Sequence, residues 1–253
     1  MSKCNQVYSL LSVFVCLLIS PCFMIRNPYH YSGSPLSGLM NCKKEVFYDF
    51  LRDVRINWRK LMHHINAQLW TRIKVRSDRK DRTTCLIIDD TDFPKTGKKM
   101  ELIGRVHSHL MHKSILGFKA LFLGITDGVS QMLLDFALLG EKGSDGKYGM
   151  SRKELEARYS PDRNRDDAAG ERLVEYGKDK ITLAMDMVRN AIKNGFRFEY
   201  LLADSWSTCK AIIRFIHSRH IKCHYLGCIK IGEKRREKLN FSTPKVEFFK
   251  HIS

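Results

Sequence analysis

The sequence lacks the cysteine pattern of a disulfide-linked or zinc-binding protein. None of its eight cysteines forms a Cys-x-x-Cys pair, and several lie inside apolar runs, where cysteine usually behaves as a small buried hydrophobic residue. A chain of 253 residues is also too long to need a disulfide framework. We therefore expect reduced thiols and a cytoplasmic protein.

An apolar run of the length that crosses a membrane is also missing. The apolar run from Tyr8 to Phe23 is shorter than the roughly 20 residues of a spanning helix. With Lys3 before it and Ser20-Pro21-Cys22 near its end, it has the form of a secretory signal over residues 1–25. A buried helix of an N-terminal domain is the alternative that we favour, because scattered cysteines would be unusual in a secreted protein. No membrane is expected as a partner.

Acidic residues are scarce in relation to basic ones. The chain has 44 Lys and Arg against 27 Asp and Glu, a formal net charge of +17 and a pI near 9.6. This balance favours a polyanionic partner, most simply nucleic acid, although an ordinary solvated basic surface is the alternative. Hydrophobic residues make up 43% of the chain, which predicts a sizeable core rather than disorder.

The first third of the chain is predicted to be helical. Residues 27–42 have the composition of a loop, and apolar spacings of three to four then predict helix over residues 43–75. Basic residues interleaved with this pattern either contact DNA phosphates or form a solvated face: Arg52, Arg55, Arg59, Lys60, Arg72, Lys74 and Arg76. A charged hinge at residues 77–82 suggests a boundary between residues 1–78, a possible partial DNA-binding domain, and residues 79–253.

The rest of the chain predicts three strands followed by alternating helices and strands. Strands are expected at 84–89, 117–126, 132–139, 199–204 and 222–231, and helices at 176–194 and 207–218. Residues 140–170 are expected to be a loop or an exposed helical excursion. Three hairpin-connected strands followed by parallel βαβ units give a mixed sheet with helices on its faces. This is the order of the ribonuclease H-like fold, so we predict an α/β domain of that kind preceded by a short helical region.

Two acidic motifs stand at the ends of predicted strands. They are residues 86–92, Leu-Ile-Ile-Asp-Asp-Thr-Asp, and residues 200–206, Tyr-Leu-Leu-Ala-Asp-Ser-Trp. A carboxylate at the C-terminal end of a buried strand lies where ligands bind in open α/β folds. Two such carboxylates could hold a hard divalent cation, which in a basic protein indicates phosphodiester chemistry.

These motifs resemble those of insertion-sequence transposases of the DDE superfamily, which cut and paste DNA. The matching segments are residues 87–97, Ile-Ile-Asp-Asp-Thr-Asp-Phe-Pro-Lys-Thr-Gly, and residues 201–206, with further similarity at 117–119, 124–128 and 134–136. The resemblance implies hydrolysis and strand transfer at the ends of an element. It also implies double-stranded DNA as partner, as terminal repeats and as target, a homodimer and association with the nucleoid.

The resemblance further implies two metal ions, usually Mg²⁺ with Mn²⁺ possible, held by two Asp and one Glu. It places the first ligand at Asp90, with Asp89 as the alternative, and the second at Asp204. For Asp89 and Asp92 we favour turn or cap roles, and we expect the two residues after Asp204 to start and pack the next helix. The basic residues that could contact DNA are Lys95, Lys98, Lys99, Arg105 and Lys119.

The third acid of the family has no match. In the family the Glu follows a Tyr by seven residues and an Arg by four, whereas Glu247 is preceded there by Asn240 and Thr243, and Glu237 also fails. We therefore expect a chain that stops before the catalytic Glu, a fragment with impaired catalysis.

Other interpretations stay open. His107, His109 and His112 have a spacing that suggests zinc, but a basic DNA-facing loop fits better because no acidic or cysteine partner is near in sequence. Asp90 and Asp92 could be the nucleophile and acid of a haloacid dehalogenase-type phosphatase, although that fold expects a parallel βα unit next. A non-catalytic DNA-binding remnant is the third possibility.

Overall fold

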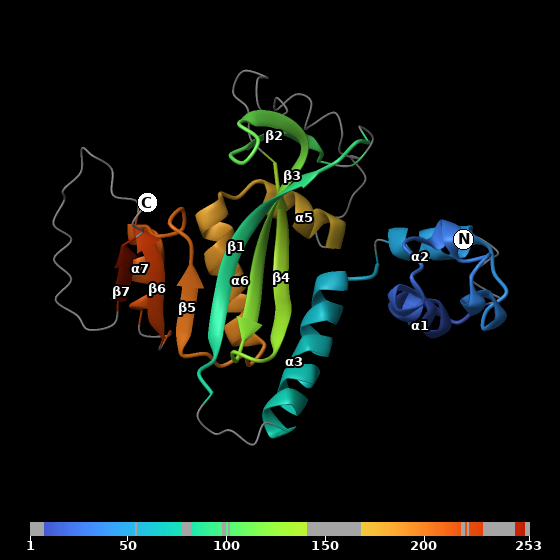
Figure 1. Ribbon diagram of the computed structural model, residues 1–253, viewed down its shortest axis with the longest axis horizontal. Coiled ribbons are helices and arrows are strands. Elements are labelled where there is room, and N and C mark those ends of the chain that lie inside the picture. Colours follow the sequence, from blue (N-terminus) through green and yellow to red (C-terminus); the bar gives the residue numbers. More distant parts are fainter. Residues whose placement is uncertain are drawn as a thin grey trace. The chain divides into compact units, whose positions relative to one another are not determined.

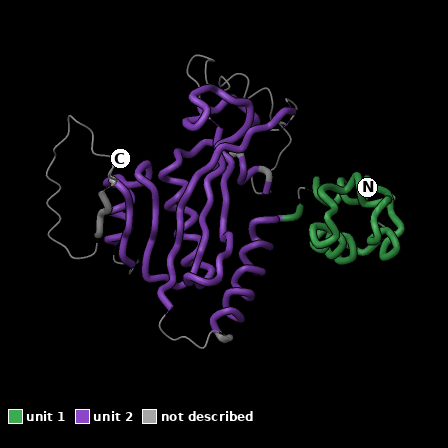
Figure 2. The backbone as a smooth tube through the Cα atoms, in the orientation of Figure 1, with its two compact units in different colours: residues 1–56 green, residues 57–253 purple. Residues whose placement is uncertain are grey.

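The computed structural model divides the chain into two compact units, residues 1–56 and 57–253 (Figure 2). It describes residues 8–53, 55–76, 82–97, 100, 102–140, 168–218, 221, 223–229 and 246–250. Lys98 and Lys99, two of the predicted DNA contacts, lie outside these residues.

The first unit is a small helical assembly. Its elements are α1 (Leu10–Ile19), the short 3₁₀ helices η2 (Ser20–Phe23), η3 (Pro28–His30) and η4 (Pro35–Gly38), and α2 (Lys44–Arg52). The apolar run predicted as a buried helix forms α1, which begins where the Ser9 hydroxyl accepts a hydrogen bond from the Ser12 N–H. Tyr31 is buried against Phe47, and its hydroxyl donates to the Leu36 carbonyl at 2.7 Å. None of the helices that the structure describes combines the length and the apolarity needed to cross a membrane.

The second unit is built on a seven-stranded mixed sheet (Figure 1). The strands are β1 (Cys85–Pro94), β2 (Gly104–Ser108), β3 (Lys113–Thr126), β4 (Gln131–Leu139), β5 (Tyr200–Ala203), β6 (His224–Ile229) and β7 (Val246–Lys250). β3 pairs antiparallel with β1, β2 and β4, while β1, β5, β6 and β7 run parallel in that order. The order β4-β3-β1-β5-β6 confirms the predicted ribonuclease H-like arrangement.

Helices pack on this sheet through one large core and a smaller cluster that contains Tyr176. They are α3 (Trp58–Arg76), α5 (Ala168–Tyr176), α6 (Lys180–Lys193) and α7 (Lys210–Ile216). Leu86 and Ile88 of β1 are fully buried in one cluster with Val188 of α6 and Ile212 of α7. Because β1 and β5 lie at the centre of the sheet, this burial fixes the position of both strand ends.

A buried set of charges joins α3 to the sheet. The Arg59 guanidinium lies 2.9 Å from Asp135 of β4, a residue only 2% exposed, and it also pairs with Glu175 of α5. His63 lies 3.4 Å from the same aspartate. Arg59 therefore serves the fold, which corrects the prediction that it contacts DNA or solvent.

Several predicted boundaries differ from the structure. The helix expected over residues 43–75 forms two helices, α2 and α3, and the Asn57 side chain accepts a hydrogen bond from the Lys60 N–H at the start of α3. α3 lies in the second compact unit, although the sequence analysis grouped residues 1–78 together. The sequence analysis also missed β2 and β7 and the start of β3 at Lys113. Most of the expected excursion at residues 140–170 lies outside the described residues, and α5 begins at its end.

Candidate active site

The site forms where β1 extends beyond the end of its parallel neighbour β5. Ile88 pairs with Ala203, the last residue of β5, while β1 continues to Pro94 against β3. Residues 89–94 therefore have no β5 partner on that side, and Asp204 follows directly where β5 stops. Because parallel strands end at the same edge of a sheet, the two acidic motifs meet there.

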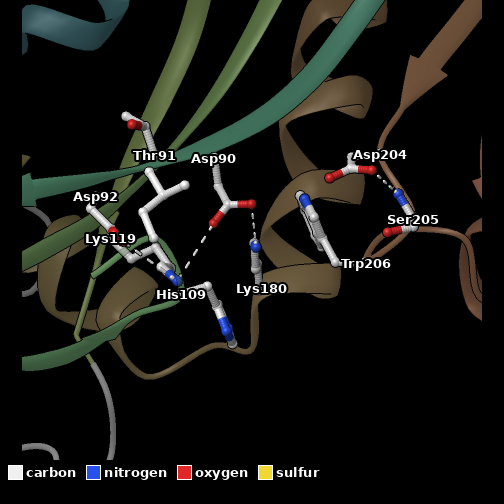
Figure 3. Close-up of a pocket in the computed structure, with 10 residues that line it drawn as sticks. Asp90, Thr91, Asp92, His109, Lys119, Lys180, Asp204, Ser205 and Trp206 are labelled. Atoms are coloured by element: carbon white, nitrogen blue, oxygen red, sulfur yellow. Dashed lines mark hydrogen bonds and ion pairs between the residues drawn. The ribbon is translucent and has the colours of Figure 1, made fainter. Parts of the chain in front are cut away.

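Strand alternation decides which carboxylate faces the helices. Asp90 and Asp92 lie on the face of Leu86 and Ile88, which pack against α6, whereas Asp89 lies on the opposite face. Asp92 is thus part of strand β1 and not of a turn, which corrects its predicted role. A pocket of about 350 Å³ opens beside these carboxylates and is lined by Asp90, Thr91, Asp92, His109, Leu110, Lys119, Lys180, Asp204, Ser205 and Trp206 (Figure 3).

Two lysines neutralise the carboxylates of β1. Lys180, the first residue of α6, places its ammonium 2.6 Å from Asp90 Oδ1. Lys119 of β3 lies 3.6 Å from Asp92 and 4.0 Å from Asp90 Oδ2. The Asp90 carboxylate, 12% exposed, is consequently approached by an ammonium at each oxygen.

Lys180 is enclosed on a second side by an aromatic ring. Its ammonium lies 3.3 Å from the centre of the Trp206 ring, a cation–π contact. Burial lowers the pKa of Lys180, and the hydrogen bond to Asp90 opposes that change. Trp206, predicted only to pack the next helix, therefore takes part in the pocket.

Asp204 is held by the turn that follows β5. Its side chain accepts a hydrogen bond from the Ser205 N–H, and its carbonyl accepts one from the buried Ser207 hydroxyl at 2.7 Å. The Tyr225 hydroxyl of β6 lies 2.9 Å from the Thr208 hydroxyl in the same turn. These contacts fix the carboxylate at the sheet edge.

The alternative ligand Asp89 borders a different pocket. Its carboxylate accepts a hydrogen bond from the Asp90 N–H at 2.8 Å. With Asp204 it lines a second pocket of about 450 Å³ on the other face, among Ile87, Leu202 and other largely apolar residues. Asp204 thus borders both pockets, and only the Asp90 pocket also holds lysines.

Some of the other residues predicted for the site line the Asp90 pocket, and others lie away from it. Lys119 lines the Asp90 pocket, but Lys95 lies over the Phe93 ring at 3.6 Å and Arg105 is exposed on β2. His109 also lines the pocket. Across the described parts of the chain, no three His, Cys, Asp or Glu side chains form a group that could hold a metal, so the histidines there form no zinc site.

Lys180 is a pocket residue that the sequence motifs do not include. A signal for it existed, because the helix predicted over residues 176–194 leads into the strand predicted over residues 199–204. A helix that crosses over between parallel strands runs antiparallel to them, so its first residues return to the carboxyl edge of the sheet.

The donor set suits a hard divalent cation. Asp90 and Asp204 offer carboxylate oxygens, the ligands that Mg²⁺ and Mn²⁺ prefer, and Mg²⁺ needs only one or two from the protein. The Lys180 ammonium at 2.6 Å shows that a cation is accommodated beside Asp90.

A protein family and a solved structure are similar to this chain. A family described as DDE superfamily endonuclease matches residues 23–223. No curated protein matches the chain. Among solved structures, the cryo-EM structure of a piggyBac transposase synaptic complex with hairpin DNA is similar, with 13% identity and a TM-score of 0.42. The match covers 90% of this chain and 42% of that one, so the chain spans less than half of that transposase.

Proposed function

The chain belongs to the DDE superfamily of endonucleases, and from this membership we propose that it is the core of an insertion-sequence transposase that cuts and rejoins DNA at element ends. The observation that carries the proposal is that Asp90, just beyond the last pair of β1 with β5, and Asp204, just after β5, line the same pocket. The net charge of +17 fits a double-stranded DNA partner.

Asp90 and Asp204 are the proposed metal ligands. Mg²⁺ or Mn²⁺ ions bound there would neutralise negative charge on the phosphate oxygens of DNA. They would also activate the oxygen that attacks phosphorus. The turn at Asp204 keeps the second carboxylate in place, and Lys119 holds the end of β1 through Asp92. We prefer Asp90 to Asp89 because Asp90 shares its pocket with positively charged side chains that could also contact a phosphate.

The pocket contains two of the three acids that the resemblance implies. Asp92 is a third carboxylate there, but Lys119 pairs with it at 3.6 Å. Glu247, rejected on its sequence context, belongs to β7, which pairs with β6 and is separated from β1 by two strands, β5 and β6. We therefore propose slow catalysis by this chain, and a homodimer on element ends as the form that acts.

A non-catalytic DNA-binding protein is the second candidate, and the positive charge favours it equally. The phosphatase alternative fits less well. It expects a parallel βα unit after Asp90, whereas β1 is followed by the antiparallel strands β2 and β3.

The two candidates differ in their response to divalent ions. Labelled duplexes from the DNA that flanks the chain's reading frame would be incubated with Mg²⁺ or Mn²⁺, and cleavage and strand transfer measured. The proposal expects metal-dependent products that Asp90→Ala and Asp204→Ala abolish. Salt-sensitive binding without any product would instead support the DNA-binding protein.

A further inference from the structure

Lys180 occupies the side of Asp90 that faces the second motif. Its ammonium lies 2.6 Å from Asp90 Oδ1 and 3.3 Å from the centre of the Trp206 ring. Trp206 follows Asp204 by only two residues, and Figure 3 shows Lys180 below Asp90 with the Trp206 ring on the side towards Asp204. A cation that belongs to the protein is therefore already paired with Asp90 on the side of Trp206.

A metal ion and this ammonium exclude each other. Mg²⁺ binds a carboxylate oxygen at about 2.0–2.1 Å, closer than the 2.6 Å of the present ion pair. Both cannot use Asp90 Oδ1 from the same direction. A divalent ion that binds Asp90 Oδ1 on the side of Trp206 thus requires Lys180 to leave.

The displaced lysine has a natural new partner. A lysine ammonium is a compact charge on a flexible four-carbon stem, and it binds phosphates. Lys180 is 26% exposed at the edge of an open pocket that also holds Lys119. A DNA phosphate entering this pocket would attract the ammonium away from Asp90.

We propose that Lys180 keeps Asp90 closed to divalent cations in the free protein and moves to a DNA phosphate when DNA binds. DNA binding then opens the metal site, and the two ligands are coupled through one side chain. By thermodynamic reciprocity, divalent cations strengthen DNA binding by the same factor. The inference rests on the proposed metal site and assigns Lys180 as a positioning residue.

The test measures Mn²⁺ binding to the full chain by the loss of the free Mn²⁺ signal in electron paramagnetic resonance. Titrations are run with and without a short duplex of arbitrary sequence, and binding to the duplex alone is subtracted. The variants are Lys180→Met and Lys180→Arg. Lys178→Met is the matched control, because Lys178 pairs with Asp186 at 2.7 Å and does not line the pocket.

Without DNA, Lys180→Met should bind Mn²⁺ about tenfold more tightly than the wild type, because Asp90 is free in every molecule. DNA should raise the affinity of the wild type and leave that of Lys180→Met nearly unchanged. Lys180→Arg, which keeps the charge, and Lys178→Met should both behave as the wild type does. A lysine that only supports the fold would not produce this loss of coupling.

Two results would overturn the inference in different ways. Equal Mn²⁺ affinity of the wild type and Lys180→Met would refute the role of Lys180 and leave the metal site intact. Binding that is absent in all variants, or unchanged in Asp90→Asn, would refute the metal site as well. If Lys180→Met does not fold, Lys180→Gln provides the same comparison.

Discussion

Ile88 and Ala203 are the last paired residues of two parallel strands, and their pairing places both acidic motifs at one edge of the sheet. β5 stops there, whereas β1 runs on to Pro94 with support from β3 alone. The pocket exists because one strand is longer than its neighbour. Changes that disturb the end of β1, the start of α6 or the attachment of the helices should therefore be measurable in stability and at the site.

The buried charges of α3 should contribute strongly to stability. Asp135→Ala removes the buried carboxylate that pairs with both Arg59 and His63, so we expect a loss of about 3–5 kcal/mol in the free energy of unfolding. Urea denaturation measures this loss. The control is Arg189→Ala, which breaks the exposed pair with Asp186 and should cost below about 1 kcal/mol. Equal losses in the two variants would show that the buried charges contribute no more to the free energy of unfolding than the exposed pair does.

The start of α6 should contribute to the stability of the fold in a pH-dependent way. The Thr182 side chain and backbone N–H donate to Asp179 and hold the pKa of this carboxyl below its ordinary value. A carboxyl with a lowered pKa stabilises the fold above its unfolded pKa, and this stability is lost as the pH falls through the folded pKa. Asp179→Ala should cost about 1 kcal/mol at neutral pH.

Denaturation curves at several pH values check this prediction. The difference between the wild type and Asp179→Ala should shrink as the pH drops below about 4. Asp179→Asn keeps the cap without the charge, so its stability should lack this pH dependence. A difference between wild type and Asp179→Ala that stays constant across the range would contradict the assignment.

Replacement of Gly117, which pairs with Pro94 where β3 meets the end of β1, should destabilise the fold. Its φ is +157°, and a Cβ there would lie 2.3 Å from the Phe93 carbonyl oxygen, a backbone atom that cannot move away. Gly117→Ala should therefore destabilise the fold by about 1–3 kcal/mol and displace the end of β1. Gly97→Ala, where a Cβ meets open space, is the matched control. Similar melting temperatures of the two variants would contradict this account.

The fold was largely predictable because its central strands carry strong local signals. The short apolar runs before Asp89 and Asp204 favour buried strands, and the turn at residues 127–130 is fixed because Asp127 accepts hydrogen bonds from the Val129 and Ser130 N–H groups. The missed strand β2 has only one apolar side chain, Val106, between Arg105 and His107, and its pairing with β3 is a tertiary contact that local pattern does not encode.

Only part of the site could be predicted from the sequence, for a similar reason. Asp90 and Asp204 follow the predicted strands and could be named from the motifs, and both line the pocket. Lys180 reaches Asp90 only because α6 packs across the sheet, and the two residues are 90 positions apart in sequence, from 180 to 90. Strand alternation, which separates Asp89 from Asp90, depends on knowing which face the helices cover.

The central claim is that Asp90, and not its neighbour Asp89, acts with Asp204. The most direct test compares the Mn²⁺-dependent cleavage of the flanking-DNA duplexes by Asp90→Asn and Asp89→Asn, two variants of identical chemistry on opposite faces of β1. Asp90→Asn should lose about a hundredfold or more in rate, and Asp89→Asn should stay within a few fold of the wild type. If Asp89→Asn lost cleavage while Asp90→Asn still cleaved the duplexes, the site would lie on the opposite face of the sheet. A wild type that binds these duplexes but never cuts them would contradict a catalytic role for this pocket.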